Sequence, residues 1–115
     1  MVAETSIFTK IINRELPADI VYEDEHCIAF KDIHPSAPVH ILLVPKTCIP
    51  MLSDGSLNHA ELLGHLMLTA PKVAEIMGLN DTFRLVVNNG AGAGQTVFHL
   101  HLHIIGGRDL HWPPG

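Results

Sequence analysis

The sequence has few positive charges. Seven lysines and arginines stand against twelve aspartates and glutamates, which gives a formal net charge of −5 at pH 7. Proteins that bind a nucleic-acid backbone neutralise its phosphates with lysine and arginine, so this balance argues against DNA or RNA as a partner. It does not argue against one small phosphate compound held by local dipoles.

Long apolar runs and closely spaced cysteines are also missing. The longest apolar run falls far short of the roughly 20 residues that span a bilayer, and residues 1–6 are too polar and too short for a signal peptide. Cys27 and Cys48 lack the C-x-x-C spacing of metal sites and both lie in apolar runs, so we expect buried, reduced thiols. These features predict a soluble cytoplasmic protein without membrane contact.

The length of 115 residues fits one domain, and the apolar fraction of 47% is normal for a folded chain. Hydrophobic periodicity and turn residues divide it into helices and strands. We predict a short helix over residues 5–14, a hairpin of strands 19–23 and 27–31, a strand over 39–44, a long helix over 57–77 and strands over 83–87 and 97–105. The predicted fold is α+β, with a mostly antiparallel sheet of about five strands and helices on one face.

Histidine is abundant, with nine in the chain, and three of these alternate with apolar residues near the C-terminus. In a strand, His99, His101 and His103 share one face, while Leu100, Leu102 and Ile104 share the other. Three imidazoles on one face bring six polar nitrogens that need hydrogen-bond partners, so packing of a hydrophobic core does not explain this pattern. The pattern therefore predicts a functional site.

Two chemistries fit this pattern. In an extended strand, the backbone positions of His99 and His103 lie roughly 13 Å apart. Two of the three histidines could therefore share a metal with an outside ligand, but the side chains of all three would have to bend severely inward to do so. Alternatively, the central imidazole is a nucleophile and its neighbours bind oxygens of a phosphoryl group. The preceding loop favours the second chemistry, because Gly90, Gly92 and Gly94 let backbone N–H groups point at an anion beside Thr96.

Several segments together carry a resemblance to a known family. They are Gly94-Gln95-Thr96-Val97-Phe98-His99-Leu100-His101-Leu102-His103-Ile104-Ile105-Gly106-Gly107-Arg108, the ending His111-Trp112-Pro113-Pro114-Gly115, and the earlier runs Ile7–Ile12, Phe30–Ile33 and Ala37–His40. This pattern resembles the histidine triad (HIT) superfamily and, within it, the Hint branch of nucleoside phosphoramidases. The resemblance implies one HIT domain over residues 1–115.

The resemblance also implies an activity: hydrolysis of the P–N bond of purine nucleoside 5′-phosphoramidates to AMP and an amine. His101 would form a nucleotidyl-histidine, with no metal and no cofactor. His99 and His103 would bind phosphate oxygens and the leaving group, and His40, which its residue type alone suggests to be a buried structural histidine, becomes the fourth catalytic histidine. The remaining nucleotide-binding residues would be Phe30, Asp32, Ile33, Asn88, Gly94, Gln95, Thr96 and Trp112.

Within that set, Asp32 would hold the ribose hydroxyls, and Phe30 and Ile33 would line the base pocket for an AMP- or GMP-type nucleotide. The resemblance further implies a homodimer with one continuous sheet, in which the Trp112 segment reaches the partner's site. This sequence departs from its relatives at Cys48, where they usually carry histidine, and at Pro71 inside the long helix. A nucleotide-binding scaffold with little turnover and a zinc-dependent hydrolase remain the alternatives.

The mechanism requires His101 to be neutral at its attacking nitrogen, with its other nitrogen bonded to an acceptor. Clustered histidines favour neutrality, since one charged ring raises the cost of charging the next. We also expect a neighbouring histidine with an ordinary pKa near 6.5 to protonate the departing amine.

Overall fold

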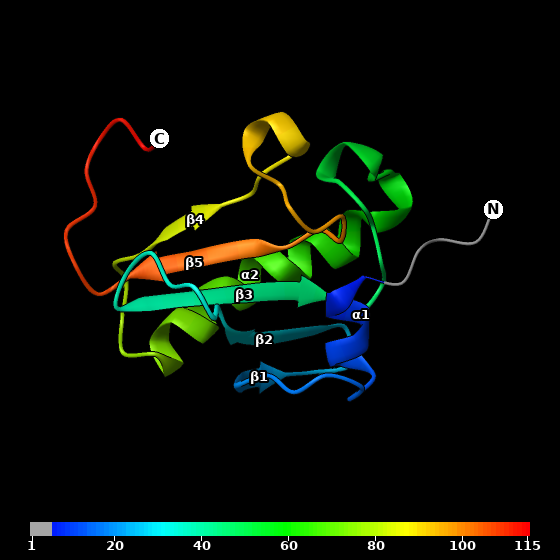
Figure 1. Cartoon of the computed structure of the whole chain (residues 1–115), viewed down its shortest axis with the longest axis horizontal. Coiled ribbons are helices and arrows are strands. Elements are labelled where there is room, and N and C mark those ends of the chain that lie inside the picture. The colour runs from blue at the N-terminus through cyan, green and yellow to red at the C-terminus, as the bar shows by residue number, and fades with distance from the viewer. Residues whose placement is uncertain (1–5) are drawn as a thin grey trace.

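The computed structural model describes residues 6–115 and has the predicted α+β architecture (Figure 1). Its strands are β1 (Ile20–Glu23), β2 (Cys27–Lys31), β3 (Val39–Pro45), β4 (Arg84–Val86) and β5 (Leu102–Gly106), and its α-helices are α1 (Ile7–Ile12) and α2 (Ala60–Ile76). The strands form one sheet in the order β1-β2-β3-β5-β4, and every neighbouring pair is antiparallel.

The two helices cover opposite faces of the sheet, so the prediction that both lie on one face is wrong. Alternation along β3 places Ile41 and Leu43 in the core cluster that contains α2 residues. Leu42 and Val44 belong to the second cluster, together with Phe8 and Ile11 of α1. A strand that is apolar on both faces does not reveal which helix covers which face. The sequence pattern of β3 therefore could not show that the two helices lie on opposite faces.

α1 is shorter than the predicted helix over residues 5–14, of which residue 5 lies outside the described part of the chain. The Ser6 hydroxyl caps its N-terminus by accepting a 3.0 Å hydrogen bond from the Thr9 amide. Arg14, with φ of 63°, takes a left-handed conformation that ends the helix before Pro17 is reached. Phe8 and Ile11 are the buried residues of α1.

The predicted long helix divides into a 3₁₀ turn, Leu57–His59, and α2. As expected, Gly78 follows the helix with φ of +80°, a conformation that favours glycine. α2 continues without interruption across Pro71, which is exposed, so water can replace the backbone hydrogen bond that proline cannot donate. No helix within residues 6–115 is long and apolar enough to cross a membrane.

The last strand is much shorter than the predicted span over residues 97–105. It begins at Leu102 because its pairing with both neighbouring strands ends near this residue. The last pair with β3 is Leu43 with Leu102, and the last pair with β4 is Val86 with His103. Residues 97–101 lie outside the sheet, and the Leu100 amide donates to the carbonyl oxygen of Ile49 at 2.6 Å. His99 and His101 therefore precede β5, and only His103 lies in it.

Candidate active site

The three histidines share one side of the sheet, as predicted, although two of them precede the strand. Leu100, Leu102 and Ile104 are buried in the cluster on the α2 side. The imidazoles lie on the α1 side, where the Phe8 ring packs edge-on against His101 with centroids 5.0 Å apart. The rings of His101 and His103 are also 5.0 Å apart.

The ring of His99 is completely buried, and both of its nitrogens have partners within the chain. Nε2 lies 2.7 Å from the Pro45 carbonyl oxygen, which can only accept, so Nε2 carries the proton. Nδ1 therefore accepts from the Ser6 hydroxyl at 2.8 Å, and burial lowers the pKa of His99 and keeps it neutral. The role of His99 in binding phosphate oxygens stays a prediction, and in this structure its contacts with Ser6 and Pro45 fix the backbone before His101.

His101 is held in the tautomer that a nucleophile requires. Its Nδ1–H donates a 2.7 Å hydrogen bond to the carbonyl oxygen of His99, which leaves the lone pair on Nε2. Burial lowers the pKa of His101, although the hydrogen bond and the Asp32 carboxylate oppose that shift. At neutral pH the ring is therefore uncharged, and its free nitrogen can attack phosphorus.

His40 and His103 form a second fixed pair. The Ser36 amide donates to His40 Nδ1 at 3.0 Å, so the proton of neutral His40 is on Nε2, 2.9 Å from His103 Nδ1. His103 Nδ1 accepts the hydrogen bond from His40 Nε2–H, so the ring proton of neutral His103 is on Nε2. Within residues 6–115, His103 Nε2 is the only buried side-chain nitrogen or oxygen without a hydrogen-bond partner. An orphaned donor beside His101 is available for a ligand oxygen or nitrogen.

Burial, reinforced by His101 and His40, lowers the pKa of His103 to about 4. The expectation of a neighbouring imidazolium with an ordinary pKa is therefore wrong for His103, because desolvation opposes its positive form. At pH 7 this residue donates its Nε2–H as a neutral ring.

A cavity of about 400 Å³ opens beside these histidines. Of the predicted site residues, it is lined by Phe30, Asp32, Ile33, Thr96, His101 and His103. The Asp32 carboxylate accepts from the His34 amide at 2.8 Å, and its other oxygen is 3.4 Å from His40 Nε2. Sequence reasoning missed the apolar wall, which α1 and the following turn supply through Ile7, Phe8, Ile11, Leu16, Pro17 and Ala18.

The remaining predicted binding residues do not line this cavity. Gln95 is 3% exposed, and its amide bonds to Gly90, Pro50 and Val97, so it holds the loop together rather than offering a side chain to a ligand. Gly94 has φ of +96° and lies against the Asn88 amide. Trp112 is 82% exposed. The prediction that Trp112 reaches the partner's site stays a prediction.

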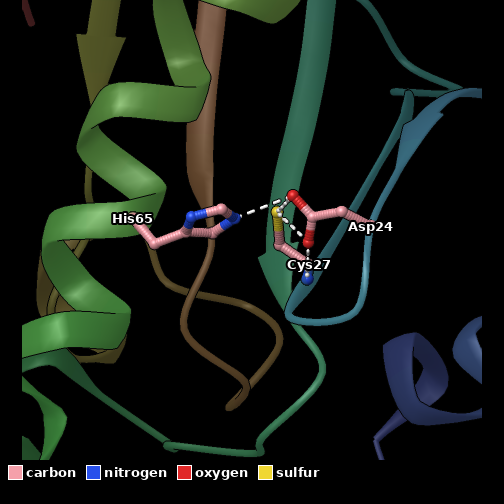
Figure 2. A group of neighbouring side chains, drawn as sticks. All are labelled: Asp24, Cys27 and His65. Atoms are coloured by element: carbon pink, nitrogen blue, oxygen red, sulfur yellow. Dashed lines mark hydrogen bonds and ion pairs between the residues drawn. The ribbon is translucent and has the colours of Figure 1, made fainter.

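Two groups of possible metal ligands occur within residues 6–115, and neither contains His99 or His101. One is Asp32, His40 and His103, whose ligand atoms lie within 4.8 Å of one another. The other joins the β1–β2 hairpin to α2 through Asp24, Cys27 and His65 (Figure 2). In that group, His65 Nε2 and Cys27 Sγ lie 2.7 Å and 3.4 Å from the Asp24 carboxylate. Burial, followed by the Asp24 charge, raises the pKa of Cys27 to about 12, so its thiol stays protonated.

Asp24 is the centre of this second group, and we expect it to make stability depend on pH. Partial burial would raise its pKa, but hydrogen bonds from the His26 amide, the His65 ring and the Tyr22 hydroxyl outweigh burial and lower the pKa well below its usual range. A carboxyl whose pKa falls on folding stabilises the fold above its unfolded pKa near 4, and this contribution fades as pH falls below that value.

Asp24→Asn should therefore lower the free energy of unfolding by about 2 kcal/mol at pH 6, and the gap to wild type should shrink below pH 4. Urea denaturation across this pH range measures the gap. Asp19→Asn is the matched control, since Asp19 forms an ion pair with Lys31 and is 67% exposed. If the difference in unfolding free energy between wild type and Asp24→Asn did not change with pH, the conclusion that folding lowers the pKa of Asp24 would be contradicted.

The comparisons with known proteins agree with this geometry. The model of the HIT domain matches residues 13–110. An uncharacterized HIT-like protein of Synechocystis is 62% identical over 98% of this chain and 99% of its own length, and a 14 kDa zinc-binding protein of Zea mays is 46% identical over 96% and 88%. A HIT family hydrolase from Legionella pneumophila superposes with a TM-score of 0.92 at 44% identity, covering 95% of this chain and 98% of its own. The chain thus belongs to the HIT family.

Proposed function

We propose that this protein hydrolyses the P–N bond of purine nucleoside 5′-phosphoramidates through a covalent nucleotidyl-histidine on His101. The observation that carries the proposal is the pairing of a neutral His101, fixed with its lone pair on Nε2, with the orphaned Nε2–H of His103. The cavity beside them has the size of a small-molecule site. The Legionella relative, named a hydrolase, supports the reaction class.

In the first step, His101 Nε2 forms a bond to the α-phosphorus while the P–N bond breaks and its electron pair goes to the departing nitrogen. Charge that develops on the phosphoryl oxygens is stabilised by His103 Nε2–H and the Thr96 hydroxyl, since both residues line the cavity. Because His103 is neutral at pH 7, it does not supply the proton that the departing amine needs. The substrate nitrogen is protonated before the P–N bond breaks, or it takes a proton from water as it leaves. Water then attacks phosphorus, the bond from phosphorus to His101 Nε2 breaks with its electron pair returning to the ring, and AMP leaves while the water loses a proton to the solvent.

The apolar wall of the cavity suits a purine base. The Phe30 ring is 4% exposed and Ile33 is 85% exposed, so one forms a fixed wall and the other an open side that a base can cover. Asp32 lines the same cavity as Phe30, His101 and His103, so we propose that its carboxylate accepts hydrogen bonds from the ribose hydroxyls.

Asp32→Asn tests the position of the ribose. We expect KM for adenosine 5′-phosphoramidate to rise by about 10- to 100-fold, because a charge-assisted hydrogen bond is worth about 1.5–3 kcal/mol. The 2′-deoxy substrate, which lacks one hydroxyl, should suffer less. If both substrates weaken equally, Asp32 acts through its contact with His40 rather than on the sugar.

We also propose a homodimer, because β4 is a three-residue strand at the edge of the sheet and an uncovered edge invites pairing. A second copy seated there would bring the exposed Trp112 toward the neighbouring site. Light scattering at micromolar concentration should give about twice the mass of one chain. A mass of one chain at all concentrations would contradict the dimer.

Two alternatives make different predictions for one experiment. The protein is incubated with adenosine 5′-phosphoramidate, with and without a strong chelator, and AMP is measured. The nucleophile proposal requires turnover that survives chelation. A zinc hydrolase, which the name of the Zea mays relative brings into consideration, would lose activity and recover it with added metal. A binding scaffold would bind the nucleotide with negligible turnover.

A further inference from the structure

Ser6 stands at the start of α1, yet its hydroxyl also contacts a histidine 93 residues later in the chain. The oxygen accepts from the Thr9 amide at 3.0 Å and lies 2.8 Å from Nδ1 of the buried His99 ring. Because the Pro45 carbonyl oxygen holds the proton of His99 on Nε2, Nδ1 needs a donor. The Ser6 hydroxyl is that donor, since the Thr9 hydroxyl is 3.5 Å from Nδ1, too distant for a good hydrogen bond.

The segment around His99 needs such support because it lies outside the sheet. Residues 97–101 precede β5, so no ladder of backbone hydrogen bonds joins them to a neighbouring strand. A backbone hydrogen bond from the Leu100 amide to the Ile49 carbonyl oxygen helps to hold the segment, and the His99 ring, tied at both nitrogens, is a further anchor. The carbonyl oxygen of His99 in turn accepts from His101 Nδ1–H at 2.7 Å. Its position therefore sets the tautomer and the place of the nucleophile.

We propose that Ser6 is a positioning residue for the reaction at His101, acting through the ring and the backbone carbonyl of His99. The inference rests on the proposed function, because it gives Ser6 a part in the attack by His101. Loss of the Ser6 proton leaves a buried lone pair on His99 Nδ1 without a partner, which is costly. The ring relieves that cost by turning or by taking a proton on Nδ1, and either response moves the carbonyl that orients His101. Ser6 does not line the cavity beside His101, so it orients the nucleophile rather than binding the nucleotide.

A purely structural role is the competing explanation, since Ser6 also caps α1. Two variants of equal size separate the roles, because asparagine and aspartate have the same shape and both cap helices well. The oxygen of an asparagine amide can accept from the Thr9 amide while its NH₂ group donates to His99 Nδ1, whereas an ionised aspartate can only accept. Ser6→Asn and the smaller change Ser6→Thr therefore keep both the cap and the donor. Ser6→Asp keeps only the cap, and Ser6→Ala removes both.

Steady-state kinetics with adenosine 5′-phosphoramidate gives the first readout. We expect Ser6→Ala and Ser6→Asp to lower kcat by about tenfold or more with little change in KM, because a small misplacement of a reacting group is costly. Ser6→Thr, Ser6→Asn or both should stay close to wild type. Thr9→Val is the control, because it removes the hydroxyl beside Ser6 and keeps the amide that the cap uses. If Ser6→Asp is as active as wild type, Ser6 acts only as a helix cap and the proposal is overturned.

Nitrogen NMR of the histidine rings gives a second readout, which loss of a helix cap alone does not move. The ¹⁵N shift distinguishes a ring nitrogen that carries a proton from one with a free lone pair. In wild type we expect the proton of His99 on Nε2 and that of His101 on Nδ1. In Ser6→Ala and Ser6→Asp, we expect His101 to become a mixture of tautomers.

An unchanged His101 spectrum in both of these variants would overturn the proposal while leaving the proposed reaction intact. If the wild type does not hydrolyse the phosphoramidate, the proposed function fails. The NMR comparison then still decides whether Ser6 sets the tautomer of His101.

Discussion

His101→Ala should lower kcat/KM for adenosine 5′-phosphoramidate by about 10⁴-fold or more, because removal of a covalent nucleophile costs several orders of magnitude. The neighbouring groups cannot replace it. His99 has both nitrogens engaged and is completely buried. His103 presents a protonated Nε2, which is a donor and not a nucleophile.

Steady-state kinetics of the pure variant measures this loss, with Tm and nucleotide affinity as checks that the site survives. His26→Ala is a suitable control, since His26 is exposed and does not line the cavity beside His101. Activity within tenfold of wild type in His101→Ala would contradict the nucleophile assignment.

Phe8→Ala should destabilise the protein by about 3–5 kcal/mol, the cost of truncating a buried phenylalanine. Phe8 is 4% exposed and touches Phe30 and His101 through edge-on ring contacts. α1 has only six residues, too few for independent stability, so its attachment depends on Phe8 and Ile11. Loss of this contact would also open His101 to water and move the pKa of His101 back toward its usual value.

Urea denaturation at fixed protein concentration measures the stability loss, and the pH dependence of kcat/KM reports the change at His101. Ile7→Ala on the same helix is the control, because Ile7 is 52% exposed and should cost less than about 1 kcal/mol. Equal losses in both variants would show that Phe8 does not anchor α1.

The part of the site that depends on local periodicity could be predicted from the sequence. Alternation of leucine and isoleucine with histidine placed the three imidazoles on one side, and the structure confirms this. The length of the strand could not be predicted, because β5 begins where its two partners stop pairing with it. Pairing partners are set by the tertiary fold and leave no mark in the alternation itself.

The roles of individual residues required the tertiary structure. His99 and His101 look equivalent in the sequence, yet one is enclosed by Ser6 and Pro45 and the other lines a cavity. Gln95 lies between predicted binding residues, but its side-chain amide already forms hydrogen bonds with Gly90, Pro50 and Val97. The apolar cavity wall comes from residues 7–18, far from the histidines in sequence, and their helical pattern indicated burial but not what they cover.

The stereochemistry at phosphorus tests the central claim most directly. One diastereomer of adenosine 5′-phosphoramidothioate, with sulfur replacing a non-bridging oxygen, is hydrolysed in ¹⁸O-labelled water, and the configuration of the thiophosphate product is determined. Attack by His101 and then by water gives two in-line displacements, each of which inverts phosphorus. The account therefore predicts net retention, even if the intermediate never accumulates. Net inversion would mean that water attacks the substrate directly, and would contradict the covalent role of His101.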